Sequence, residues 1–115
     1  MILVVILLFS LAATIGLIMV FIGIRYRRGS LVLGLGHAGI ASLALTLLVV
    51  QIFRERVHHL LYNDAALLFI LTLLGGLVLL ALRESRKPPP MIVVGLHAAM
   101  ALFALLLLVA GYLHR

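Results

Sequence analysis

The pattern of apolar and polar positions divides the chain into four long apolar stretches that are separated by short polar connections. The stretches cover about residues 2–24, 31–53, 65–82 and 91–113, and the charged residues gather between them. A helix needs roughly 20 consecutive apolar residues to cross the ~30 Å hydrocarbon core of a bilayer. The pattern therefore predicts an all-α integral membrane protein, a four-helix transmembrane bundle that forms a single transmembrane domain over residues 1–115.

The ends of two predicted spans carry residues that suit helix termini. Asn63 and Asp64 precede the third stretch, and a polar side chain of either kind can cap the first turn of a helix. Pro90 precedes the fourth stretch, and proline is well tolerated where a helix starts. We therefore expect the third span to start at residue 65 and the fourth at residue 91.

Composition supports a membrane location over a soluble one. The 115 residues are 66% hydrophobic and only 10% charged, with a mean hydropathy of +1.38, which leaves too little polar surface for a water-soluble protein. The net charge of +6 would suggest nucleic acid as a partner in a soluble protein. Here the basic residues flank apolar spans, so we expect the lipid bilayer as the partner and no nucleic acid. Without cysteine, histidine is the strongest metal ligand that the chain offers.

The distribution of basic residues predicts an orientation in the membrane. Connections 25–30 and 83–90 hold six of the nine basic residues: Arg25, Arg27, Arg28, Arg83, Arg86 and Lys87. Loops rich in Lys and Arg stay on the cytoplasmic side. We therefore expect both connections to be cytoplasmic and both termini periplasmic, in a bacterial inner membrane.

The chain also repeats itself at an offset of 60 residues. At this offset Gly16 aligns with Gly76 and His37 aligns with His97, together with a series of alanines and leucines around each histidine. The offset predicts two tandem parallel helical-hairpin repeats, residues 1–55 and 61–115. Because each repeat holds two spans, the second and fourth spans run in the same direction, and the two histidines are expected at the same depth.

The paired histidines are the candidate metal and cofactor ligands. In an up-down-up-down bundle the second and fourth spans lie on one diagonal, so the imidazoles of His37 and His97 are expected to face each other. Small residues surround them in the sequence pattern: Gly34, Ala41 and Ala101 on the histidine-bearing spans, and Gly16 and Gly76 on the other two. Two opposed imidazoles among small residues are what a flat macrocycle with axial nitrogen ligands needs, and haem b meets that description.

With these residues the chain resembles the four-helix core of membrane b-type cytochromes. In that family, histidines on diagonally opposed helices hold haem, and glycines on the flanking helices admit it. The resemblance implies one-electron transfer, with a quinone or a larger membrane redox complex as partner. Family members with a second haem carry further histidines where this chain has Gln51 and Gly111, so the resemblance implies a single haem site.

Two other interpretations remain open at the level of sequence. The histidines can instead form structural hydrogen bonds in a cofactor-free accessory or scaffold subunit, or each can bind a (bacterio)chlorophyll magnesium from one face.

The sequence contains no Ser–His–Asp or paired-carboxylate constellation that would indicate hydrolytic chemistry. Small four-span multidrug exporters depend on a membrane-embedded glutamate in the first span, and residues 1–24 contain none. We expect an electron carrier rather than an enzyme, and the sequence leaves open whether it forms a homo-oligomer.

Overall fold

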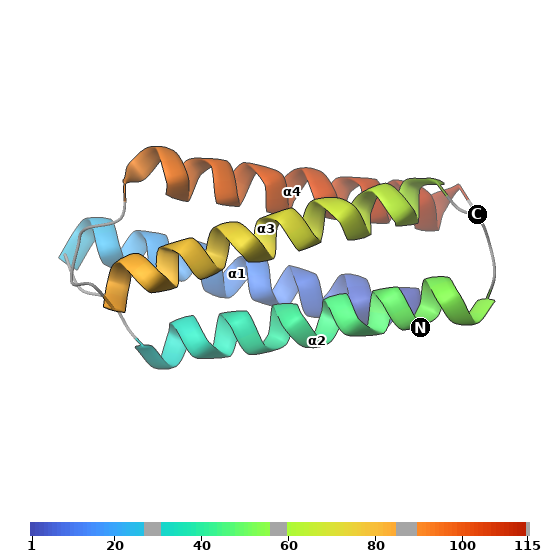
Figure 1. Cartoon of the computed structure of the whole chain (residues 1–115), viewed down its shortest axis with the longest axis horizontal. Coiled ribbons are helices and arrows are strands. Elements are labelled where there is room, and N and C mark those ends of the chain that lie inside the picture. Colours follow the sequence, from blue (N-terminus) through green and yellow to red (C-terminus); the bar gives the residue numbers. More distant parts are fainter. Residues whose placement is uncertain (27–30, 56–59, 85–89, 115) are drawn as a thin grey trace.

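The computed structural model describes residues 1–26, 31–55, 60–84 and 90–114, and this part of the chain is helical without any strand (Figure 1). Its four helices are α1 (Ile2–Tyr26), α2 (Leu31–Glu55), α3 (Leu60–Glu84) and α4 (Met91–Leu113). Each is long and apolar enough to cross a membrane. The predicted all-α, four-helix transmembrane fold is confirmed, and the chain is an integral membrane protein.

The helices run up, down, up and down along the long axis of the molecule, so both termini lie at the same end (Figure 1). We call this end, with the C-terminus of α2 and the N-terminus of α3, the terminal end. The opposite end, where α1 leads to α2 and α3 leads to α4, is the hairpin end. Within the described residues, α1 and α3 each contact both α2 and α4. The pairs α1/α3 and α2/α4 therefore occupy the two diagonals of the bundle.

The length of the bundle matches a membrane. It measures 44 × 19 × 19 Å between Cα atoms, and a 25-residue helix such as α1 is about 37 Å long at 1.5 Å per residue. Large apolar side chains are exposed on the outside of the bundle, among them Val32 (80% exposed), Phe53 (78%) and Ile92 (73%). Such a surface is stable in contact with lipid and not with water.

The third helix begins five residues earlier than the sequence predicts. α3 starts at Leu60, so Asn63 and Asp64 lie within the helix and do not cap it. Both side chains are exposed, and helices commonly extend beyond the hydrocarbon core into the polar headgroup layer, where such side chains are tolerated. The predicted start of α4 is confirmed, since the carbonyl of Pro90 accepts hydrogen bonds from the backbone N–H groups of Val93 (3.0 Å) and Val94 (3.2 Å).

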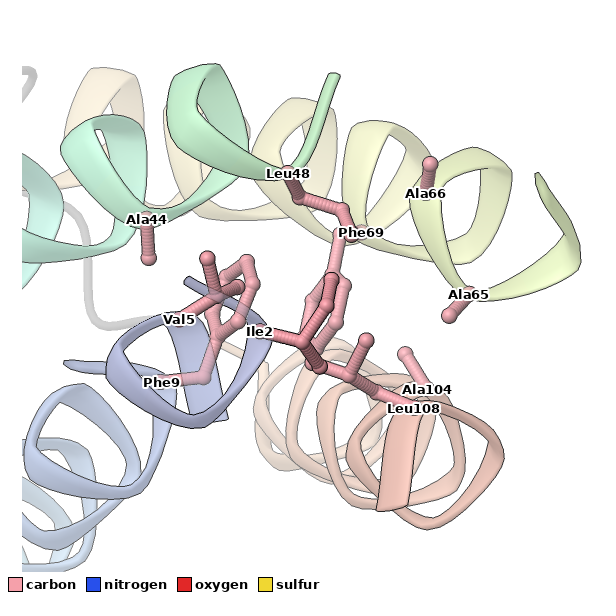
Figure 2. Packing of buried hydrophobic residues seen from close by; sticks show 10 residues of the cluster. All are labelled: Ile2, Val5, Phe9, Ala44, Leu48, Ala65, Ala66, Phe69, Ala104 and Leu108. Atoms are coloured by element: carbon pink, nitrogen blue, oxygen red, sulfur yellow. The ribbon is translucent and has the colours of Figure 1, made fainter. Parts of the chain in front are cut away.

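The buried core lies in the terminal half of the bundle. Figure 2 shows its side chains, which come from all four helices: Ile2, Val5, Phe9, Ala44, Leu48, Ala65, Ala66, Phe69, Ala104 and Leu108. The rings of Phe9 and Phe69 stack across the α1/α3 diagonal, with their centroids 3.6 Å apart and their planes 2° from parallel. This stack joins two helices that have no backbone contact with each other.

Many core residues that are 60 positions apart have matching environments. Ala44 and Ala104 are fully buried, as are Leu48 and Leu108. At the terminal end, residues that are 60 positions apart differ in size instead. Gly111 stands where the first half has Gln51, and a Cβ on Gly111 would lie 2.7 Å from Cε1 of Tyr62, so this glycine makes room for the tyrosine ring. These observations describe equivalent positions, and the origin of the two halves by duplication stays a prediction.

Candidate functional site

His37 of α2 and His97 of α4 meet across the second diagonal of the bundle. The centroids of their rings are 6.1 Å apart, and the ring planes make an angle of 71°. Both residues are half-buried. The two helices have no backbone contact with each other, so the imidazoles extend toward each other through the interior. This is the juxtaposition that the sequence predicts.

One nitrogen of each ring is held by the backbone of the neighbouring helix. Nδ1 of His37 donates to the carbonyl oxygen of Ala12 on α1 (2.6 Å), and Nδ1 of His97 donates to the carbonyl oxygen of Thr72 on α3 (2.9 Å). Because a carbonyl oxygen can only accept, Nδ1 must carry the proton. In a neutral ring the lone pair then lies on Nε2, which is the nitrogen available to a ligand. Ala12 and Thr72 are again 60 positions apart.

Two glycines allow each imidazole to lie close to the backbone of its neighbouring helix, α1 or α3. A Cβ on Gly16 would lie 3.1 Å from Cε1 of His37, and a Cβ on Gly76 would lie 3.1 Å from Cε1 of His97. Any larger residue would crowd the ring. The sequence pattern predicts these glycines at the border of a haem, and in the structure they lie against the histidine rings. Whether they also border a macrocycle stays a prediction.

The other small residues of the predicted site lie on the two histidine-bearing helices. Gly34, Ala41 and Ala101 are half-buried. Gly34 is one turn from His37 toward the hairpin end, and a Cβ on Gly34 would meet no atom within 4 Å. Ala41 and Ala101 lie one turn from their histidines toward the terminal end. The surroundings of the histidine pair are therefore apolar and low in side-chain volume.

The distance between the two rings is close to the distance expected for two imidazoles that share one metal ion. A metal–imidazole bond is about 2 Å long, so two rings that share a metal through Nε2 have centroids about 6 Å apart, close to the observed 6.1 Å. Metal-bound histidines usually donate their other N–H to a backbone carbonyl or a carboxylate, as both rings do here. The described residues contain no group of three or more His, Asp or Glu side chains for a metal ion.

The carbonyl groups of Ala12 and Thr72 were not predictable from the sequence as partners of the histidines. Backbone acceptors carry no signal of their own in a sequence, although both residues lie one turn from the glycines of the predicted site.

Most of the basic residues at the hairpin end fall outside the described side chains, namely Arg25, Arg27, Arg28, Arg86 and Lys87. Arg83, at the end of α3, is exposed.

Hydroxyl groups do not add to this site. Thr14, Thr46 and Thr72 each donate to the carbonyl oxygen four residues earlier in their own helix, at 2.9, 2.8 and 2.7 Å. Such bonds satisfy the hydroxyl within an apolar environment. The hydroxyl groups of these three threonines are therefore satisfied within their own helices.

Comparison with known proteins gives no match: no family model, no curated protein and no solved structure matches this chain. The fold and the site together define its class as a four-helix integral membrane protein with a pair of facing intramembrane histidines.

The two adjacent glycines of α3 provide a test of the histidine position. We expect Gly76→Ala to destabilise the protein by about 1 kcal/mol or more, since its Cβ would crowd His97 at 3.1 Å and overpacking of this kind costs about 1–3 kcal/mol. Gly75→Ala is the matched control, because its Cβ would make an ordinary contact of 3.5 Å with Nδ1 of His97 and alanine favours the helix. Thermal denaturation in detergent measures both, and equal stability of the two variants would contradict the proposed crowding.

Proposed function

We propose that this protein is a small membrane b-type cytochrome, or a haem-bearing subunit, in which His37 and His97 hold a single haem b. The observation that carries the proposal is the facing pair itself: two imidazoles with centroids 6.1 Å apart, each with Nδ1 bonded to a backbone carbonyl and Nε2 left for a metal. Haem iron with two axial histidines supplies reversible one-electron transfer. The chain would then carry single electrons within the membrane.

The residues of this chain have defined tasks under the proposal. The carbonyl groups of Ala12 and Thr72 select the tautomer of each imidazole, orient the ring and raise the basicity of Nε2. Gly34, Ala41 and Ala101 keep the surroundings of the pair low in volume, which a flat macrocycle requires. The Phe9–Phe69 stack closes the bundle on the terminal side of the pair and keeps water from that direction.

The proposal also includes an orientation and partners. The six basic residues of connections 25–30 and 83–90 support a cytoplasmic location for the hairpin end, with both termini in the periplasm of a bacterial inner membrane. A position within the bilayer supports a membrane-soluble quinone or a larger membrane redox complex as the electron-transfer partner. Basic side chains at the hairpin end are suitable partners for the carboxylates of haem propionates.

The visible spectrum of the purified protein tests the proposal. We expect the full chain, produced in haem-replete cells and purified in detergent, to show a Soret band that shifts on reduction with dithionite, with one haem per chain by haem extraction. A colourless protein would overturn the proposal and favour a cofactor-free accessory subunit. A magnesium-tetrapyrrole spectrum, insensitive to dithionite, would also overturn it and identify a pigment-binding protein instead.

A further inference from the structure

A groove runs between the neighbouring helices α2 and α3 in the terminal half of the bundle. It has a volume of about 260 Å³ and is lined by Val49, Ile52 and Phe53 of α2 and by Asn63, Ala66, Leu67 and Ile70 of α3. The residues on α3 have the i, i+3, i+4, i+7 spacing of one helix face. The groove therefore follows the helix axis for about 10 Å, the rise of seven residues. Its rim faces lipid, since Phe53, Leu67 and Ile70 are exposed.

The groove coincides with small side chains that the other half of the chain replaces by larger ones. The residue 60 positions before Ala66 is Ile6, and the residue 60 positions after Ile52 is Tyr112. Both of these larger residues are half-buried against the core. Because the bundle accepts isoleucine and tyrosine at the equivalent positions, its architecture does not require the smaller residues between α2 and α3. The space is a property of this pair of helices.

The chemistry of the groove excludes water as its stable occupant. Among the described residues that line it, Asn63 alone is polar. An ordered water needs two to four polar partners, and one amide does not supply them along an apolar groove of this length. An empty groove would lose dispersion contacts along both walls. An apolar group must therefore fill most of it.

The one polar residue lies at the level of the lipid headgroups. The bundle is 44 Å long and exceeds the ~30 Å hydrocarbon core of a bilayer by ~7 Å at each end. Asn63 is three residues, or about 4.5 Å, from the start of α3 at the terminal end. From Asn63 the groove runs inward to Ile70, toward the middle of the membrane. Its occupant must be apolar along its length, polar at its outer end and aligned with the membrane normal.

We infer that the groove binds one acyl chain of a membrane phospholipid, with the glycerol ester of that lipid next to Asn63. A phospholipid of the leaflet at the terminal end has the required polarity and direction. The side-chain amide of Asn63 can donate a hydrogen bond to an ester carbonyl, and as an exposed residue it is free to do so. A bound acyl chain would fill the space between α2 and α3 and stabilise their contact. The site lies outside the histidine pair, so lipid binding does not rest on the proposed function.

Native mass spectrometry of the full chain tests this inference. The protein is purified in detergent and titrated with palmitoyl-oleoyl-phosphatidylethanolamine, and we expect the mass of one chain with one phospholipid. Ala66→Ile introduces the residue that the chain carries at position 6. It should weaken lipid binding by at least about fivefold, because the acyl chain would have to share an overpacked groove. Ala99→Ile is the matched control, since it makes the same change on an exposed part of α4 outside the groove, and it should bind lipid like the parent.

Asn63→Leu provides a second test that does not disturb the core, because Asn63 is exposed. Loss of its hydrogen bond should weaken lipid binding by roughly threefold, the usual effect of one such bond within a membrane.

Two outcomes would overturn the inference. One is equal lipid retention by the parent, Ala66→Ile and Asn63→Leu. The other is a dimer mass that Ala66→Ile abolishes, which would show that a second copy of the chain fills the groove. The measurement does not involve haem, so a colourless protein that retains the lipid would remove the proposed function and leave the lipid site standing.

Discussion

Replacing either His37 or His97 with alanine is expected to lower the haem content of the purified protein by at least about tenfold. Loss of a group that only orients a metal ligand already costs about 10–100-fold in affinity, and here the ligand itself is lost. The two substitutions should have similar effects, because the rings occupy equivalent positions with equivalent backbone partners. The measurement is the Soret absorbance per mole of protein, with haem extraction as an independent assay.

Three comparisons separate ligation from a general loss of structure. His114→Ala removes a histidine at the C-terminal end of α4, far from the pair, and should leave the spectrum unchanged. Free imidazole added to His97→Ala should restore part of the haem binding, since the truncated side chain leaves a space of matching shape. Helical content by circular dichroism should stay the same. A His97→Ala protein with the haem content of the parent would show that this ring does not bind the iron.

The substitution Phe69→Ala is expected to reduce the stability of the protein by about 3–5 kcal/mol, the usual cost of removing a buried aromatic ring. Aromatic pairs prefer offset or edge-to-face contacts, whereas Phe9 and Phe69 are parallel within 2° at a centroid distance of 3.6 Å. Burial of the two rings among the surrounding core side chains must therefore provide most of the stabilisation. It follows that Phe69→Leu, which retains most of the volume, should cost less than about 1.5 kcal/mol.

A lipid-facing phenylalanine serves as the control for this prediction. Phe21 of α1 is 61% exposed, and Phe21→Ala should change the midpoint of thermal or SDS denaturation little, because its ring remains in an apolar environment in either state. If Phe69→Ala and Phe21→Ala have equal effects, the stack does not hold the two diagonal helices together.

The four-helix fold was predictable from the sequence, because span length and apolar composition directly meet the requirement of the bilayer. The start of α3 was not. Asn63 and Asp64 are typical of helix caps, and a local rule places them before the first turn. In the structure the helix continues through them to Leu60, since exposed polar side chains at this level are tolerated on a helix.

The meeting of His37 and His97 was also predictable. Two co-directional spans on one diagonal place the histidines at equal depth, and an ionisable side chain within a membrane span faces the interior of the bundle. Three features depended on the tertiary structure alone. They are the carbonyl partners on α1 and α3, the face-to-face stack of Phe9 and Phe69, and the confinement of the buried core to one half of the bundle. All three depend on how each helix is rotated about its axis and tilted against its neighbours. These helices are apolar on every face, so no polar side indicates which residues turn inward, and only the fit between the four helices decides it.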